Sequence, residues 1–347
     1  MTKKPNTIDP RDLGYVCLTE FLASELPTPR TIIHPWLYEG QVAMLHADAG
    51  VGKTWFGLTL ALIASKHVSC FDYSGPAVPV LYVDGEMGRH DLHARMTKLR
   101  DTLKVDLTAG EPFKLLARDL AHEDHLHAFP DLCDPTGQDL ICDIAKDMKA
   151  GLVVLDNYRT LAQLEDENDA TAFQSLNRFL KRLARGRAVI GVHHNNKHSK
   201  MSGSTALETV LSHRFNLVKS TPTVVGQACF TLRLEKNRTG LGADAVVPLK
   251  CELGSDGWSW SQDNESRLDE FREAAERLEF ATQKEAGDRF GVTDKTIRNW
   301  CVGLRVRGDW KTDTWAELTG KAKELRAAIA NEAEVVPEPV DDGPLEF

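Results

Sequence analysis

A glycine-rich turn between an apolar run and a helical pattern is the feature that most constrains this chain. The run Val42–His46 is typical of a buried strand, and the loop after it contains Gly50 and Gly52 and ends at Lys53-Thr54, where the helical pattern begins. In such a turn the backbone N–H groups point inward at a helix N-terminus and bind phosphate oxygens. Glycine permits the backbone angles and the close approach that this requires. The chain must therefore fold with a strand, a phosphate loop and a helix in immediate succession.

The polar residues of this turn predict a bound nucleoside triphosphate. The Lys53 ammonium would neutralise the β- and γ-phosphate oxygens, and the Thr54 hydroxyl would bind Mg²⁺. Ala47 stands where such loops usually have their first glycine, which is one departure from the motif. We predict ATP and Mg²⁺ as the cofactors. The residues expected to contact the nucleotide are Ala49, Gly50, Val51, Gly52, Lys53, Thr54 and Trp55.

Three further apolar runs are typical of buried strands. They are Val80–Asp84, Leu152–Asp156 and Ala188–Val192, and helical patterns separate them. Continuous β-branched runs of this kind indicate strands buried on both faces of a mostly parallel sheet. The predicted fold class is therefore α/β, with a mostly parallel central sheet. Beyond His213 we expect shorter connections and antiparallel strands, near residues 213–218, 228–235 and 245–251.

Composition and spacing divide the chain into four parts. We predict a flexible arm at residues 1–30, an ATPase domain at 31–262, a helix-turn-helix domain at 265–315, and a helix followed by an acidic disordered tail at 316–347. The net charge of −9 argues against nucleic acid at first, but it is unevenly distributed. Six acidic residues and no Lys or Arg lie in 331–347, so the rest of the chain is closer to neutral and can present a basic face.

The overall composition is that of a soluble globular protein, with 42% hydrophobic and 27% charged residues. The sequence contains no apolar run near the roughly 20 residues of a membrane span and no signal-peptide pattern. We therefore expect a cytoplasmic protein without membrane contact. The seven cysteines are scattered without a Cys-x-x-Cys pair, which favours reduced thiols over a disulfide framework or a zinc site.

Two acidic residues follow predicted strands. Asp156 ends an apolar run, which suits a ligand to a water of Mg²⁺, and Glu86 lies just past the second strand. Phosphoryl transfer to water needs a carboxylate that polarises the attacking water, and the carboxyl ends of parallel strands share one edge of a sheet. The alternative is that Asp84 or Glu86 only caps the next helix. Asp84 is the poorer candidate for the base because it still lies within the apolar alternation.

Residues 282–300 have the spacing of a helix-turn-helix motif. Thr293 would cap the second helix, with Lys295 and Arg298 facing outward, where a recognition helix contacts DNA. The run Arg305–Trp310 is a candidate wing of a winged-helix-like domain. Similar helical triplets also pack on proteins, and that alternative stays open.

Several motifs occur in a definite order within residues 31–262. After the phosphate loop come a glutamate past the second strand, then Leu-Asp, His-His-Asn-Asn-Lys, Gly-Ser-Thr-Ala-Leu and Lys-Asn-Arg-Thr-Gly. This order resembles the RecA-like hexameric replicative helicases of the RepA and DnaB kind, which plasmids and phages use in replication. The resemblance implies a RecA-like P-loop ATPase domain, a homo-hexameric ring and single-stranded DNA as a partner.

The resemblance also implies roles near the nucleotide. Glu86 matches the catalytic glutamate of that family. His193 or His194, at the end of the fourth strand, matches a polar sensor of the γ-phosphate, and His194 is the preferred candidate. The alternative is a packed pair of surface histidines.

Four basic residues match positions that contact partners in that family. Lys197 and Lys200 lie where the family has its DNA-binding loop, although a solvated loop would have the same composition. Lys236 and Arg238 match the pair that reaches onto the nucleotide of a neighbouring subunit, where an arginine finger stabilises transition-state charge. A charge pattern on a strand edge is the alternative for these two residues.

These features lead to three hypotheses. The first is an ATP-dependent helicase or translocase that acts on single-stranded DNA in phage or plasmid replication. The second is a RecA-like recombination mediator or single-strand annealing ATPase, and the third is a regulatory ATPase that binds duplex DNA. The acidic end, residues 341–347, resembles the tip of single-stranded-DNA-binding proteins that docks replication partners, with a plain solubilising tail as the alternative.

Overall fold

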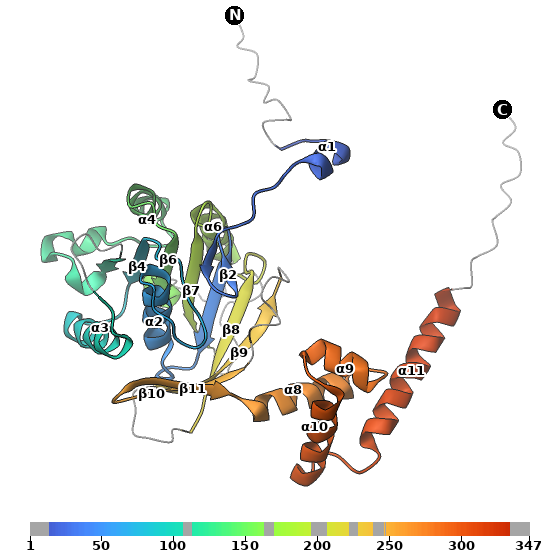
Figure 1. Cartoon of the computed structure of the whole chain (residues 1–347). Coiled ribbons are helices and arrows are strands. Elements are labelled where there is room, and N and C mark those ends of the chain that lie inside the picture. The colour runs from blue at the N-terminus through green and yellow to red at the C-terminus, as the bar shows by residue number, and fades with distance from the viewer. Residues whose placement is uncertain are drawn as a thin grey trace, which may run out of the picture. The chain divides into compact units, whose positions relative to one another are not determined.

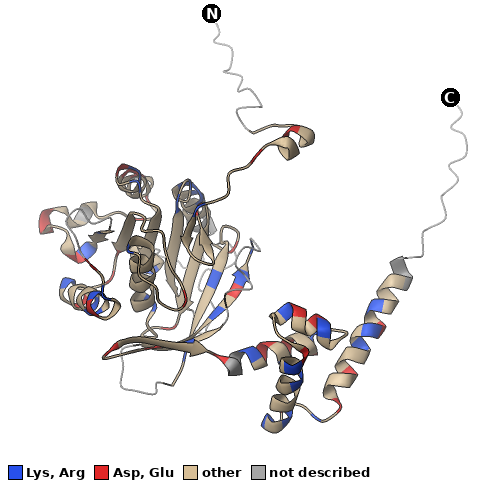
Figure 2. Ribbon diagram, viewed as in Figure 1, with Lys and Arg blue, Asp and Glu red and all other residues tan. Residues whose placement is uncertain are grey.

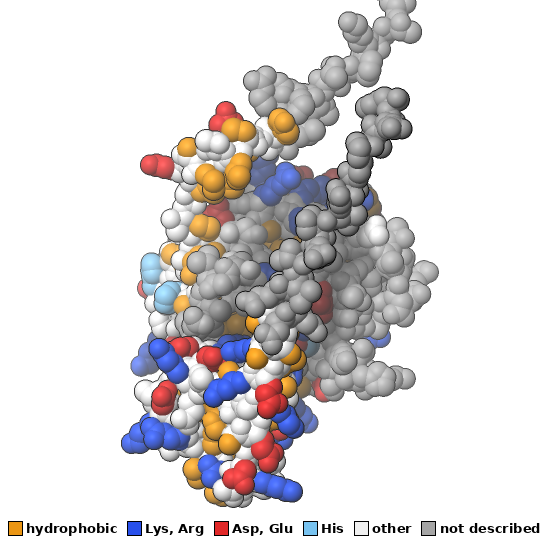
Figure 3. All heavy atoms as spheres, turned by 90° about the vertical axis from the view of Figure 1, so that its right-hand side faces the viewer, with side chains coloured by type: hydrophobic (Ala, Val, Ile, Leu, Met, Phe, Trp, Pro, Cys, Tyr) orange, Lys and Arg blue, Asp and Glu red, His pale blue; other side chains and the backbone are white. Residues whose placement is uncertain are grey.

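The chain divides into two units, Met1–Arg30 and Thr31–Phe347. The computed structural model describes residues 14–106, 113–162, 170–195, 207–221, 228–238, 246 and 248–333. In the first unit, helix α1 spans Leu18–Ala23, and its apolar side chains are largely exposed (Figure 3). Within the described part of the chain, no helix is both long enough and apolar enough to cross a membrane.

The second unit is built on a nine-stranded sheet in the order β11-β10-β9-β8-β3-β7-β6-β4-β5 (Figure 1). The strands from β8 to β5 in this order run parallel, and β9, β10 and β11 extend the sheet antiparallel. The strands are β3 Val42–Ala47, β4 Val80–Asp84, β5 Phe113–Ala117, β6 Leu152–Asp156, β7 Ala188–His194, β8 His213–Lys219, β9 Ala228–Asn237, β10 Leu249–Gly254 and β11 Gly257–Gln262. A separate two-stranded sheet pairs β1 Thr31–Ile33 with β2 Leu37–Tyr38. The predicted α/β class with a mostly parallel sheet is confirmed.

Helices cover both faces of the sheet because its central strands are apolar on both sides. Along β3, Ala43 and Leu45 pack in one core with α2 and α3, whereas Val42 and Met44 pack in the other with α4 and α6. Successive strand residues point to opposite faces, so a continuous apolar run must be covered twice. The helices are α2 Lys53–Ser65, α3 Arg89–Leu103, α4 Pro135–Asp147, α5 Tyr158–Leu161 and α6 Ala170–Leu183, with 3₁₀ turns at Arg118–Leu120 and Glu123–Ala128.

The carboxyl-terminal residues form a helical group with a core of its own. It contains α8 Asn264–Glu276, α9 Gln283–Phe290, α10 Asp294–Arg307 and α11 Thr314–Ala333. The turn between α9 and α10 contains Gly291 in the left-handed region, and the Thr293 side chain accepts a hydrogen bond from the N–H of Thr296 at 3.3 Å. These are the turn and the cap expected of a helix-turn-helix.

The expected wing at Arg305–Trp310 is wrong. Its first half is the last turn of α10, which ends at Arg307 and is capped by Gly308 with φ of 84°. Trp310 is buried in the helical core, which leaves no exposed hairpin there. A glycine just past a helix end is the usual C-cap, and that signal was present in the sequence.

We expect Phe271→Ala to unfold the helical group selectively. Phe271 is fully buried, and its ring centroid lies 5.3–6.4 Å from those of five aromatic side chains. Truncating a buried Phe costs about 3–5 kcal/mol, which is a large part of a small domain's stability. The five partners are Phe280, Phe290, Trp300, Trp310 and Trp315.

Near-ultraviolet circular dichroism and tryptophan emission would report the loss, and nucleotide binding should persist because the phosphate loop belongs to a different core. The control is Val306→Ala, since that side chain is 83% exposed and should be silent. An unchanged aromatic spectrum in Phe271→Ala would contradict the assignment of this core.

Candidate active site

The phosphate loop joins the end of β3 at Ala47 to the start of α2 at Lys53. Two of its glycines have left-handed backbone angles, with φ of 74° at Gly50 and 120° at Gly52. At Gly52 a side chain is also excluded by space, because a Cβ there would lie 2.6 Å from the Cβ of Ala228 on β9. Glycine at this position therefore meets two independent requirements, one of conformation and one of packing.

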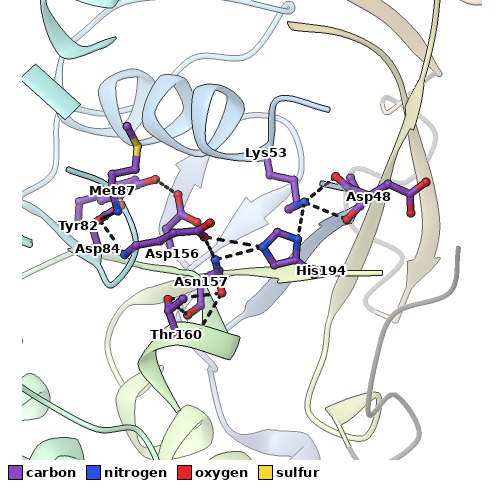
Figure 4. A network of polar contacts seen from close by, with 11 residues as sticks. Asp48, Lys53, Tyr82, Asp84, Met87, Asp156, Asn157, Thr160 and His194 are labelled. Carbon is purple, nitrogen blue, oxygen red and sulfur yellow. Dashed lines mark hydrogen bonds and ion pairs between the residues drawn. The ribbon is translucent and has the colours of Figure 1, made fainter. Parts of the chain in front are cut away.

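The Lys53 side chain turns back over the loop. Its Nζ donates to the carbonyl oxygens of Ala47 at 2.9 Å and Asp48 at 2.8 Å, and lies 3.2 Å from His194 Nδ1 (Figure 4). Burial lowers the pKa of Lys53 to about 8, although nearby carboxylates, Asp156 foremost, oppose the shift. The ammonium thus lies within the loop itself, where phosphate oxygens could replace the two carbonyls as its acceptors.

Asp156, at the end of β6, is almost completely buried. Its Oδ2 accepts a hydrogen bond from the Tyr82 hydroxyl at 2.6 Å, and its carboxylate is also hydrogen-bonded to the Thr54 side chain. Burial raises the pKa of Asp156, and these two hydrogen bonds oppose that rise. A carboxylate and a hydroxyl side by side are the hard oxygen donors that Mg²⁺ prefers, so Thr54 and Asp156 fit the predicted metal site.

Glu86 lies opposite the loop, at the carboxyl end of β4. Asn157 Nδ2 donates to Glu86 Oε2 and lies 3.3 Å from His194 Nε2, which is itself 3.8 Å from Glu86 Oε2. The Glu86 side chain is 52% exposed, so a water molecule can reach its carboxylate. Glu86, Asn157 and His194 therefore meet from three strand ends, and Figure 4 shows Asn157 and His194 facing each other.

Asn157 was not among the predicted residues. Its Oδ1 also accepts from the N–H of Thr160 at 3.2 Å, so it caps α5 while its amide nitrogen faces the site. An Asn directly after a strand-ending Asp is a helix-cap signal that the sequence did contain. The cap explains why this side chain has a fixed orientation next to Glu86.

Helix α3 has Gly88 at its N-cap and no side-chain cap, so the alternative that the next helix is capped by Glu86 or Asp84 is wrong. Asp84 Oδ1 accepts from the N–H groups of Glu86 at 3.1 Å and Met87 at 2.8 Å. Burial and, next, the charge of Asp156 raise the pKa of Asp84 to about 7. Asp84 therefore holds the turn that presents Glu86 and is fully buried, away from solvent.

The two histidines at the end of β7 point to opposite sides of the strand. His194 contacts Lys53, and burial and, next, that neighbouring charge lower the pKa of His194. His193 is buried, with its ring 6.2 Å from that of Tyr158. Of the two candidates, the structure therefore brings only His194 to the nucleotide loop, and the pair is not exposed at the surface.

Lys236 and Arg238 lie far from the phosphate loop of their own chain. Lys236 is opposite Arg214 on β8, which is opposite Met44 in the first half of β3. Strands rise about 3.3 Å per residue, so Lys236 lies roughly 13 Å from the start of the loop along the strand direction. Both side chains donate to main-chain carbonyls in the segment just before β8.

The four predicted DNA-binding residues fall in two groups. Lys197 and Lys200 lie outside the described residues. Lys295 and Arg298 are exposed on α10, and Figure 2 shows basic and acidic residues interspersed along the helices of the helical group. Lys295 and Arg298 therefore present accessible positive charge.

The chain also matches a known protein family. Residues 9–200 match the family model described as AAA domain, and the chain belongs to that family. Together with the sheet order and the phosphate loop, this makes the protein a RecA-like P-loop ATPase. The predicted ATPase class is confirmed, whereas the narrower resemblance to ring helicases stays a prediction.

The similarity to a solved structure is low. Among solved structures, the chain is similar to a KaiC-like protein from the hyperthermophilic archaeon Pyrococcus horikoshii OT3, at 16% identity and a TM-score of 0.44. The match covers 66% of this chain and 93% of the other. No curated protein matches the sequence.

We expect Tyr82→Phe to raise the Mg²⁺ concentration needed for half-maximal ATP hydrolysis by about 10-fold, because partners of metal-binding groups typically contribute 10–100-fold. The substitution removes the hydroxyl that orients Asp156 and leaves the ring in place. The matched control is Tyr158→Phe, since the Tyr158 hydroxyl is buried and has no hydrogen-bond partner among the described residues. Equal Mg²⁺ dependence in the two variants would rule out the orienting role.

Proposed function

We propose that the protein is an ATP-driven helicase or translocase that acts on single-stranded DNA as a homo-hexameric ring. The main support for this proposal is that the expected catalytic residues fall into two groups that lie far apart in one chain. Glu86, Lys53 and Asp156 converge on one loop, whereas Lys236 and Arg238 lie at the far end of β9, near the amino ends of the parallel strands. A chain with this layout could complete its charge set only with a neighbouring copy.

The residues at the loop have complementary parts in hydrolysis. Glu86 would accept a hydrogen bond from the attacking water, and Lys53 would leave the loop carbonyls to bind the β- and γ-phosphate oxygens. Bound Mg²⁺ supplies charge neutralisation at the phosphates, with Thr54 and Asp156 as its holders. Because phosphoryl transfer depends on positioning and charge, these few groups account for a basal rate, and an added cation from outside would raise it.

His194 joins this site to the segment expected to bind DNA. Its ring contacts both Lys53 and Asn157, and it is followed within a few residues by Lys197 and Lys200. A change at the γ-phosphate would therefore reach the basic segment through one short stretch of chain. The proposal takes its DNA partner from the family resemblance, together with this adjacency.

Glu86→Gln should bind ATP and lose its hydrolysis. The amide has nearly the same shape but cannot take a proton, and losing a general base typically costs about 10²–10⁴-fold in rate. Isothermal titration with ATP and a phosphate-release assay would measure the two properties separately. Retention of wild-type turnover would mean that another group activates the water.

Arg238→Ala tests the ring motor itself. We expect wild-type ATP hydrolysis to rise with single-stranded DNA, and the variant to lose about 10³-fold of that rate, as other arginine fingers do. Light scattering must show the same oligomer for both proteins, and Arg277→Ala serves as a control because that arginine is 64% exposed on the helical group. If the oligomer persists and the rate is insensitive to both DNA and Arg238, the protein is not this kind of motor.

A regulatory ATPase that binds duplex DNA is the second candidate, favoured by the exposed Lys295 and Arg298 on the second helix of the helix-turn-helix. For this function, replacing both residues with alanine should weaken duplex binding and reduce the slope of log affinity against log salt by about 2. Nuclease footprinting would then reveal one protected sequence. If the protein is instead a motor on single strands, no such footprint should appear, and a forked duplex should be unwound.

A further inference from the structure

A buried histidine outside the hydrolytic set has two polar partners, one just after β7 and one on β9. His46, on β3, is 2% exposed, with its Nδ1 2.7 Å from Asn195 Oδ1 and its Nε2 3.0 Å from Glu235 Oε2 on β9. An unpaired polar group in such a poorly solvated region costs free energy, so both contacts of the His46 ring must be kept for the sheet to be stable.

The orientation of these partners follows from a third contact. Asn195 Nδ2 donates to the Asp48 carboxylate at 3.0 Å, which turns the amide oxygen toward the ring of His46. Both ring nitrogens therefore face oxygen atoms, one of the Asn195 amide and one of the Glu235 carboxylate. Burial would raise the pKa of Glu235, but the hydrogen bond from His46 and the neighbouring groups hold it below its usual value.

The same chain of contacts continues along the strands. Glu235 also accepts from Asn216 at 2.8 Å and pairs with Arg214 at 3.1 Å, both on β8. Arg214 in turn pairs with Glu208, ahead of that strand. The Lys236 ammonium donates to the main-chain carbonyl of Glu208, so the contacts end at one of the two cations that would act on a neighbouring copy.

The other end of the chain of contacts adjoins Lys53, the expected ligand of the phosphates. The Asp48 carbonyl accepts a hydrogen bond from Lys53 in this structure. A phosphate that takes over the Lys53 ammonium removes that bond and changes the position of Asp48. Because the Asp48 side chain holds Asn195, the change is passed to His46 and from there to Glu235.

We propose that His46 and Glu235 are positioning residues of a polar relay, Asp48–Asn195–His46–Glu235–Arg214–Glu208, which couples the phosphate loop to the strand bearing Lys236 and Arg238. The relay rests on the proposed function only where it is taken to act on a neighbouring subunit of a ring. Its internal coupling can be measured in the isolated protein with nucleotide alone. Neither residue touches the phosphates, so their removal should leave nucleotide affinity largely intact.

The first experiment follows amide hydrogen exchange with and without Mg²⁺ and a non-hydrolysable ATP analogue, in wild type, His46→Gln and Glu235→Gln. In the wild type we expect nucleotide to slow exchange by about 10-fold in the β8–β9 ladder, residues 213–219 and 228–237, within the 5–150-fold range of ordinary coupling between sites. Both variants should bind the analogue with affinity within about threefold of the wild type, since neither side chain is among the expected nucleotide contacts. The exchange response should be reduced by a similar amount in each.

The double variant distinguishes a relay from two local effects. If His46 and Glu235 act as one unit, His46→Gln with Glu235→Gln should lose no more of the response than either variant alone. In hydrolysis assays, the three variants should lower the DNA-stimulated kcat about equally while KM for ATP stays near that of wild type. Additive losses would mean separate structural roles.

The matched control is His213→Gln. His213 is also fully buried in the sheet, with Nε2 2.9 Å from Gln41 Oε1, but it lies away from the phosphate loop. Its replacement should lower thermal stability and leave the exchange response intact. If His46→Gln fails to fold, Glu235→Gln carries the test, because that side chain is 31% exposed and keeps its volume.

The outcomes separate this inference from the proposed function. A nucleotide response that is reduced in Glu235→Gln supports the relay even if wild-type hydrolysis ignores DNA, in which case only the motor fails. A response that stays at the wild-type level in correctly folded variants overturns the relay, whether or not DNA stimulates the enzyme.

Discussion

The convergence of parallel strand ends on one edge of the sheet is the constraint on which the rest of this structure depends. β3, β4, β6 and β7 deliver the phosphate loop, Glu86, Asp156 and His194 to the same place because all four run in the same direction. A parallel sheet needs helices on both faces, and the continuous apolar strands supply the two cores that bind them. The chemistry is therefore a consequence of strand direction, and no single loop carries it.

This convergence has an electrostatic cost that the site balances internally. Lys53 is buried beside Asp156 and Glu86, so burial lowers the pKa of the amine while it raises that of Asp156. The Tyr82 hydroxyl and the Thr54 side chain stabilise the buried carboxylate by hydrogen bonds. Such a cluster favours binding of a polyanion together with a divalent cation. The anion pairs with the buried ammonium, and the cation pairs with the buried carboxylate.

The sequence could predict the parts of the site that follow a strand directly. Lys53, Asp156 and Glu86 are each a few residues from an apolar run, and shared strand direction then implies that they meet. Partners joined only through the sheet were out of reach: Tyr82 and Asp156 are 74 positions apart, and His46 and Glu235 are 189 apart. Such pairs depend on register and strand order, which local periodicity does not contain. The expected wing was wrong for a different reason, because the sequence did contain the glycine that caps α10 at Gly308.

The position of β9 brings these arguments together. It runs antiparallel to β8, so its first residue, Ala228, packs against Gly52 of the phosphate loop while its far end leads to Lys236 and Arg238. One strand thus touches the nucleotide loop of its own chain at one end and carries two cations away from it at the other. Glu235 lies one residue before Lys236 and contacts His46, which lies near the end of β3, just before the phosphate loop. A rigid strand with these contacts is a physical means by which the nucleotide state of one site could be felt where a neighbouring copy would dock.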